Sequence, residues 1–203
     1  MKVSGDTVLH ADAEMVWRTV TDPEVLVRTI PGCERLEVTG PDAYAMTVSA
    51  GVASIKGTYD GKVALTDQNR PSSFVLRASG AGASGTIRTD VAVRLSDGGD
   101  GTTSLRYDAD ADVGGMVGGV GQRVLTSVAK KMAGQFFANV DDVLTGAAAR
   151  APAAAPVGAR PGVFTTPPWP HAVPSGGFVK GVLVGAGVAL AGVLVGTLIG
   201  RRR

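Results

Sequence analysis

The hydrophobic pattern of this chain changes its period near residue 112, and this change constrains the fold. From residue 34 to residue 112, apolar and polar residues alternate in segments separated by turn residues, which indicates antiparallel strands with one solvated face. From residue 113 to about residue 144, apolar residues recur every three or four positions, which predicts one long amphipathic helix. Because both elements have an apolar face to bury, we expect the sheet to wrap around the helix.

The first 33 residues add one strand and two short helices. Residues 2–10 alternate like a strand, and Asp12 and Asp22 stand where helix N-caps are expected. Pro23 occupies the first position of the second helix, which ends at Ile30-Pro31-Gly32. The expected order is therefore strand, two short helices, six strands and one long helix, an α+β fold over residues 1–145.

The rest of the chain predicts a tether and a membrane anchor. Residues 146–177 hold seven of the 11 prolines and no apolar periodicity, so we expect an extended linker. Residues 181–200 carry no charge, and 20 helical residues span about 30 Å, the thickness of a bilayer core. We therefore predict an anchor helix over residues 178–203, either spanning or re-entrant. Because no signal peptide precedes Met1, we expect the cytoplasmic face of the cell membrane.

Charge is divided unequally between the two parts of the chain. All 18 acidic residues precede position 146, where they outnumber the 14 lysines and arginines and give a net charge of −4. The remaining residues carry six positive charges and no acid. An acidic head with interspersed cations argues against a nucleic-acid surface, whereas a basic apolar tail suits anionic lipid headgroups.

Residues able to perform catalysis or to bind metals are few. Cys33 is the single cysteine, which excludes an intramolecular disulfide and a cysteine-ligated metal cluster. Its expected role is that of a buried small side chain, because no histidine partner is evident. His10 and His171 are the two histidines, one near the N-terminus and one in the proline-rich linker. We therefore expect no catalytic residue and no metal site, and the chain is predicted not to be an enzyme.

Two further motifs are better explained by structure than by ligand binding. The glycine-rich run at 114–121 lacks the Lys-Ser/Thr of a phosphate-binding loop. It weakens the start of the long helix, either for movement over a cavity mouth or for close packing on the sheet. Asp108, Asp110 and Asp112 alternate on one strand face without the glycine and glutamate of a calcium loop, so a solvated face is expected.

Several short motifs, in this order, resemble a known family. They are Val16-Trp17, Ile30-Pro31-Gly32-Cys33, the VASIKG segment at 52–57, and the glycine-rich start of the last helix with its Phe136-Phe137 pair. The chain is similar in these to the carbon monoxide dehydrogenase CoxG family of the START-like, polyketide-cyclase (SRPBCC) superfamily. The resemblance implies a helix-grip fold with a hydrophobic ligand cavity between sheet and long helix. It also implies association with a molybdenum-containing carbon monoxide dehydrogenase or a related hydroxylase.

If this cavity exists, apolar positions of the strands and of the start of the long helix are expected to line it. These positions are Met46, Val48, Ile55, Tyr59, Phe74, Leu76, Val91, Tyr107, Met116, Val120 and Val124. We expect the hydroxyl of Tyr59 or Tyr107 to meet a polar group of the ligand, such as a carbonyl.

The tether, anchor and implied cavity together suggest a carrier. We expect the head to take a quinone or another isoprenoid lipid from the membrane and present it to the dehydrogenase. Such a carrier is needed because a long apolar tail is costly to expose to water. No covalently bound cofactor is expected. One alternative is an adaptor that recruits the dehydrogenase or its maturation machinery without carrying ligand. A cyclase-like enzyme is a weaker alternative, since the chain offers no evident acid–base pair.

Overall fold

A computed structural model describes residues 1–52, 54–147 and 162–165. The elements in chain order are β1 (Lys2–Leu9), α1 (Ala13–Thr21), α2 (Pro23–Thr29), β2 (Cys33–Gly40), β3 (Ala43–Val52), β4 (Ile55–Asn69), β5 (Ser73–Gly82), β6 (Gly85–Asp97), β7 (Thr103–Gly114), α3 (Gly115–Gly118), α4 (Gln122–Leu144) and β8 (Val163–Thr165). The predicted order of strand, two helices, six strands and long helix is confirmed, with the short α3 inserted before the last helix.

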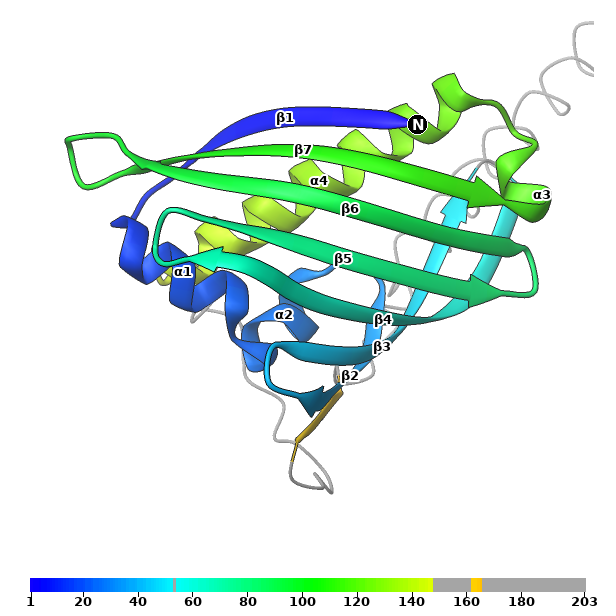
Figure 1. Ribbon diagram of the computed structural model, residues 1–203, viewed down its shortest axis with the longest axis horizontal. Coiled ribbons are helices and arrows are strands. Elements are labelled where there is room, and N and C mark those ends of the chain that lie inside the picture. Colours follow the sequence, from blue (N-terminus) through cyan, green and yellow to red (C-terminus); the bar gives the residue numbers. More distant parts are fainter. Residues whose placement is uncertain (53, 148–161, 166–203) are drawn as a thin grey trace, which may run out of the picture. The chain divides into compact units, whose positions relative to one another are not determined.

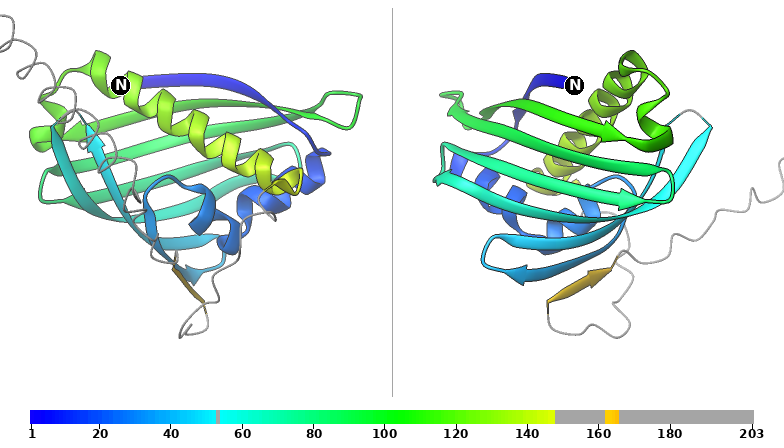
Figure 2. Two further views of the ribbon diagram at one scale, coloured as in Figure 1. Left: turned by 180° about the vertical axis from the view of Figure 1, so that it is seen from behind. Right: turned by 45° about the vertical axis from the view of Figure 1, so that its right-hand side comes forward.

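The strands form one antiparallel sheet in the order β1-β7-β6-β5-β4-β3-β2-β8. Each strand from β2 to β6 pairs with the next along the chain, as the spacing of turn residues predicts. β1 pairs with β7, from Lys2 opposite Asp110 to Leu9 opposite Thr103. The sheet is curved, and α4 crosses its concave face (Figures 1 and 2).

One end of the sheet, which we call the closed end, holds α1, α2 and the C-terminal turns of α4 (Figure 1). Both short helices begin with the predicted aspartate caps: Asp12 accepts a hydrogen bond from the Met15 amide at 2.9 Å, and Asp22 from the Glu24 amide at 2.8 Å. These caps satisfy amides that have no partner within the helix. Side chains from α1 then pack into the core.

The core of the closed end is aromatic and aliphatic. The rings of Trp17 and Phe74 meet edge to face, with centroids 5.3 Å apart. Leu9, Leu105 and Val140 around them are almost completely buried. The α4 helix therefore has its firmest contacts near its C-terminus.

At the opposite end, the sequence prediction of one helix from residue 113 needs correction. β7 continues to Gly114, and α3 covers only Gly115–Gly118 before α4 begins at Gln122. The backbone of Gly115 has φ +76° and that of Gly121 has φ +95°, in the left-handed region that an α-helix of L-residues does not pass through. The glycine run thus interrupts the helix that the apolar stripe predicts. We call α3, residues 119–124 and the β5–β6 turn the open end.

A short strand lies inside the predicted linker. Val163–Thr165 pair with β2 as β8, with Phe164 opposite Leu36, and the Phe164 side chain packs against the core. The rest of the predicted tether, apart from residues 146, 147 and 162, and the predicted anchor over 178–203 lie outside the described residues. Within the described ranges, no helix combines the length and apolarity needed to cross a bilayer.

Candidate functional site

A cavity of about 390 Å³ lies between the concave face of the sheet and α4. Strands β1 and β3–β7, the short helices α1 and α2 with the turn that follows, and the middle of α4 contribute to its wall. The lining consists of Met1, Val3, Val20, Leu26, Ile30, Pro31, Tyr44, Met46, Val63, Leu65, Phe74, Leu76, Ile87, Thr89, Val91, Val93, Leu105, Tyr107, Ala109, Ala111, Ala129, Met132, Ala133, Phe136 and Phe137. Almost all of these side chains are apolar, so the space favours a hydrophobic ligand.

The cavity exists because small side chains face one another across the two layers. Ala109 and Ala111 on β7 point to the concave face, and Ala129 and Ala133 lie one turn apart on α4. Leucine or phenylalanine at these positions would fill the space, since protein interiors otherwise pack to the density of organic crystals. The larger Met132, Phe136 and Phe137 form the walls around this gap.

Five of the eleven residues predicted from the sequence belong to this lining. They lie on the concave faces of β3, β5, β6 and β7 and are Met46, Phe74, Leu76, Val91 and Tyr107. The strand alternation therefore identifies correctly which face meets the helix. That these five side chains bind a ligand stays a prediction.

Three predicted residues of the β3–β4 hairpin, Val48, Ile55 and Tyr59, lie outside the lining. The ring of Tyr59 lies across Gly82 of β5, where an added Cβ would be only 2.9 Å from the ring atom Cδ1. The ring thus occupies the place of a side chain that Gly82 lacks. Alternation shows the face of a strand but not where along it the covering helix stops, so the prediction extended the cavity too far.

The three predicted residues at the start of the long helix also lie outside the lining. Met116 is 64% exposed and Val124 is 40% exposed, and Val120 belongs to the turn between α3 and α4. The prediction assumed one continuous helix, whereas the glycine turn between α3 and α4 changes which residues of α4 face the sheet. As a result Leu125, rather than Val124, is the buried residue in the first turns of α4.

Sequence reasoning missed the alanines and the residues of α2. Alanine is common on any helix face, so Ala129 and Ala133 give no signal in a search for large apolar residues. Leu26 and Ile30 reach the cavity because α2 folds back under the sheet, which no local pattern shows. Met132 and Phe136 were in the predicted apolar stripe, and their spacing was the available signal for this part of the wall.

Three hydroxyl groups belong to the cavity lining, and two of them have hydrogen-bond partners. Tyr44 donates to the Thr21 carbonyl at 3.1 Å, and Thr89 donates to the Asp110 carbonyl at 3.0 Å. The hydroxyl of Tyr107 forms no hydrogen bond with a described residue, and its oxygen is accessible, since no fully buried side-chain nitrogen or oxygen in the described ranges lacks a partner. Burial, and secondarily the charge of Asp6, raises the pKa of Tyr107, so its hydroxyl stays protonated as a donor.

The ring of Tyr107 is held in place on both sides. Its centroid lies 5.6 Å from that of Phe137 on α4. On the other side it crosses Gly5 of β1, where a Cβ would come within 2.6 Å of the hydroxyl oxygen. Glycine at position 5 is therefore required for this orientation of the ring, and an unpaired donor is presented by a rigid side chain.

The described residues hold no group of three or more histidine, cysteine, aspartate or glutamate side chains arranged for a metal ion. His10 lies outside the cavity, with Nδ1 at 2.8 Å from a carboxylate oxygen of Asp141. Burial raises the pKa of the Cys33 thiol, which disfavours a reactive thiolate. On the solvated face, Asp108 lies 3.4 Å from Arg94 and Asp110 lies 3.8 Å from Lys2, as surface ion pairs.

A second hollow, of about 830 Å³, lies on the outer face of the sheet. Charged residues of both signs line it, among them Asp60, Lys62, Arg88 and Asp112. Because these side chains are exposed and the hollow is open to water, it offers little gain to an apolar ligand. The smaller inner cavity is therefore the better candidate for a hydrophobic binding site.

Comparisons with solved structures identify the fold. A conserved protein from Geobacillus kaustophilus is 33% identical, covers 72% of this chain and 97% of its own, and superposes with a TM-score of 0.70. Two further structures share the fold at low identity. A START superfamily protein from Mycobacterium smegmatis is 15% identical, covers 72% of this chain and 98% of its own, and has a TM-score of 0.57. The ZhuI aromatase/cyclase from Streptomyces sp. R1128 is 16% identical, covers 74% of this chain and 96% of its own, and has a TM-score of 0.56. The antiparallel sheet with its long helix is therefore START-like.

The sequence itself matches one protein-family model. No curated protein matches the chain significantly. The model of the carbon monoxide dehydrogenase subunit CoxG matches residues 5–145, which is the whole predicted head apart from its first four residues. This range includes the strands and the helix that enclose the cavity. The chain therefore belongs to the carbon monoxide dehydrogenase CoxG family.

Proposed function

We propose that this protein carries a quinone or another isoprenoid lipid between the membrane and a molybdenum-containing carbon monoxide dehydrogenase or a related hydroxylase. The observation that carries the proposal is the apolar cavity, whose lining includes one accessible hydroxyl, that of Tyr107, without a hydrogen bond to any described residue. An apolar wall favours a hydrocarbon in general. A donor without a partner favours a ligand that brings a hydrogen-bond acceptor, such as a quinone carbonyl.

The size of the cavity is consistent with partial enclosure of such a ligand. Its volume of about 390 Å³ is near the lower end of the roughly 300–1,000 Å³ typical of small-molecule sites. It suits a ring with the first part of an isoprenoid tail, while the rest of the tail extends through the mouth. Each methylene removed from water contributes about 0.8 kcal/mol, so even partial enclosure offsets much of the cost of leaving the bilayer.

Family membership supports the choice of partner. The name of the family associates it with carbon monoxide dehydrogenase, and the matched range of 5–145 covers the head for which we propose ligand binding. We further propose that residues 178–203 anchor the chain at the cytoplasmic face of the membrane and that the linker lets the head reach its partner. Tethering raises the effective concentration of the head near both the bilayer and the enzyme.

The two other functions account for fewer of these features. An adaptor that only recruits the dehydrogenase needs no cavity in its core. The likeness to an aromatase/cyclase extends to the fold alone, at 16% identity. In the described part of the cavity lining, the titratable side chains are those of Tyr44 and Tyr107, and both have raised pKa values because of burial. We therefore propose a binding protein rather than an enzyme.

Mass spectrometry of lipid extracted from the purified full chain tests this function. We expect a stoichiometric isoprenoid lipid in the unsubstituted protein and its loss in Ala133→Trp, which places an indole in the cavity. Ala138→Trp is the matched control, since Ala138 lies on the exposed face of the same helix. Ala129→Phe serves as a second blocking variant if Ala133→Trp does not fold, because overpacking costs about 1–3 kcal/mol.

The outcomes separate the alternatives. An unsubstituted chain that carries no lipid would favour the adaptor, and folded blocking variants that retain lipid would exclude this cavity as the site. For a carrier, the blocking variants should also stop reduction of membrane quinone by the dehydrogenase. Turnover of the dehydrogenase with a soluble dye should continue.

A further inference from the structure

Three large apolar side chains are exposed around the open end. Met116 of α3 is 64% exposed, Val124 of α4 is 40% exposed and Ile87 of β6 is 38% exposed. α3 is fixed beside β6 because the Val117 amide donates to the Ser84 carbonyl at 3.1 Å and the Val117 side chain is buried. The exposed residues therefore belong to an ordered surface. α3, the start of α4 and the β5–β6 turn lie together at this end (Figures 1 and 2).

The inner cavity reaches the surface at this same end. Ile87 belongs to the cavity lining and is also one of the exposed apolar residues. The first residue of the chain, Met1, lines the cavity as well, and its amino group donates to the Ala111 carbonyl. At the other end of the sheet, Leu9 and Val16 are completely buried, and Leu105 forms part of the cavity wall. At Ile87, the cavity wall therefore adjoins the exposed apolar residues of the open end.

The helical side of this surface, formed by α3 and α4, carries charge of one sign. Residues 113–140 contain no aspartate and no glutamate, whereas they contain Arg123, Lys130 and Lys131, in a head with net charge −4. All three cations are exposed, and none forms an ion pair with a described residue. By contrast, Arg18 and Arg70 at the closed end both pair with Glu14.

We propose that the open end is the surface with which the head docks onto an anionic lipid bilayer. Exposed apolar tips flanked by unpaired cations are the combination that binds at the level of lipid headgroups, where apolar atoms leave water and cations meet phosphate. Docking in this orientation places the cavity mouth against the bilayer. The proposal rests on the proposed function and adds a membrane-contacting surface to it. Its tests require neither ligand nor dehydrogenase, so the docking surface and the carrier function can each be refuted separately.

A pair of cysteine variants tests the orientation in the full chain. Met116→Cys and Val8→Cys replace exposed apolar residues near opposite ends of β7, since Val8 pairs with Ser104 and is 54% exposed. Each is labelled with an environment-sensitive fluorophore and mixed with phosphatidylcholine vesicles with or without phosphatidylglycerol. The unsubstituted chain, whose single cysteine is the buried Cys33, provides the labelling background.

We expect a blue shift of the label at position 116 on phosphatidylglycerol vesicles and no shift at position 8. Equal shifts at both positions, or none at position 116, would overturn the proposal. A shift at position 116 that requires purified dehydrogenase and does not occur with vesicles would also overturn it, because the surface would then serve a protein partner.

Charge reversal tests the cations separately. The triple variant Arg123→Glu, Lys130→Glu, Lys131→Glu, carrying the label at position 116, should lose the blue shift on anionic vesicles. The control Lys62→Glu changes an exposed cation on the outer face of the sheet and should keep the shift. Added salt should weaken the shift in the control and have no effect in the triple variant, because screening acts on exposed charges. A triple variant with an unchanged shift would show that these cations do not contact lipid.

Discussion

The two ends of α4 meet different surroundings. Near its C-terminus, Val140 is completely buried, and Asn139 donates to the carbonyl of Thr29 in α2 at 2.9 Å. At its N-terminus, the helix starts after Gly121 with no side-chain cap, and Val124 in the first turn is exposed. The C-terminal half of α4 is therefore firmly packed, whereas its first turn is loosely packed.

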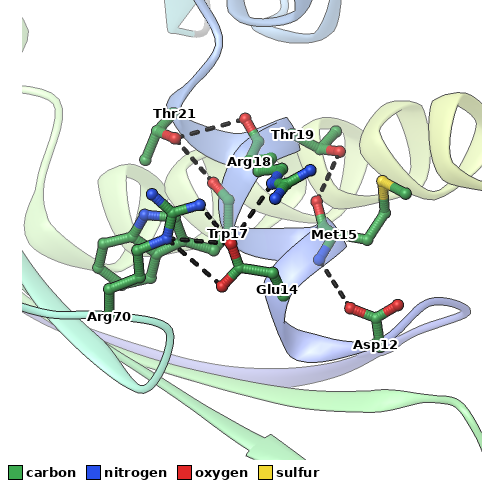
Figure 3. Close-up of polar contacts among 8 residues, drawn as sticks. All are labelled: Asp12, Glu14, Met15, Trp17, Arg18, Thr19, Thr21 and Arg70. Atoms are coloured by element: carbon green, nitrogen blue, oxygen red, sulfur yellow. Dashed lines mark hydrogen bonds and ion pairs between the residues drawn. The ribbon is translucent and has the colours of Figure 1, made fainter.

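The polar contacts of the two ends differ in the same way. At the closed end, Glu14 accepts hydrogen bonds from Arg18 and Arg70, and Asp12 caps α1 (Figure 3). At the open end, α3 also has no side-chain cap, and Arg123 forms no ion pair with a described residue. Because stability is concentrated at the closed end, the open end is free to serve binding without endangering the fold.

The largest expected effect comes from removing the main aromatic side chain of the closed end. Trp17→Ala should lower the free energy of unfolding by about 3–5 kcal/mol, because a buried indole and its contact with Phe74 are lost. Met116→Ala at the open end should change it by no more than about 0.5 kcal/mol, as is usual at exposed positions. Urea denaturation of both variants measures the difference. Similar losses in the two would contradict the contrast between the ends.

A smaller effect is expected from the hydrogen bond between α4 and α2. Asn139→Ala leaves the buried carbonyl of Thr29 without its donor, and this should cost about 1–3 kcal/mol. Gln135→Ala, one turn earlier on the exposed face of α4, is the control and should be nearly neutral. Thermal melting distinguishes them. An Asn139→Ala variant as stable as the control would mean that the two helices are held by apolar packing alone.

Within the cavity, two tyrosines allow stability and binding to be separated. Tyr107→Phe should weaken ligand binding by about two- to tenfold, the value of one hydrogen bond, with little change in melting temperature. Tyr44→Phe removes a hydroxyl already paired with the Thr21 carbonyl, so it should lower stability and leave affinity nearly unchanged. Titration with a short-chain quinone and thermal melting measure the two quantities. The opposite result would place the ligand contact at Tyr44.

Most of the closed end could be predicted from the sequence, because its signals are local. The positions of Asp12 and Asp22 in the sequence are enough to predict two helix N-termini, and Pro23 supports the prediction of the second helix. The strand alternation likewise identifies the concave face, including Met46 and Tyr107. Each of these inferences needs only neighbours in the chain.

The open end and β8 could not be predicted in the same way. Whether Gly115 and Gly121 adopt positive φ depends on the packing of α3 against the β5–β6 turn, through the bond from Val117 to Ser84. β8 forms because Phe164 meets Leu36, from a segment whose composition resembles a linker. The cavity itself results from absent side-chain volume at Ala109 and Ala133, and a pattern of large apolar residues does not reveal empty space.

The smallest expected effect concerns pH and again belongs to the closed end. The hydrogen bond from Arg70 lowers the pKa of Glu14 below its ordinary value of 4.5, against the opposing effect of desolvation. Since the folded-state pKa is the lower one, the carboxylate stabilises the fold at pH values above 4.5. This contribution is lost as the pH falls through the lowered pKa.

Arg70→Ala should therefore reduce the melting temperature at neutral pH, and its difference from the unsubstituted protein should narrow as the pH falls below 4.5. Arg88→Ala, which removes an exposed cation without an ion pair in the described part of the chain, corrects for the change in net charge. Both ion pairs of Glu14 are solvent-exposed, so the effect should also shrink at high salt. A difference between the two variants that stays constant across this pH range would mean that Arg70 acts by packing its alkyl chain on α1 and not through the charge of Glu14.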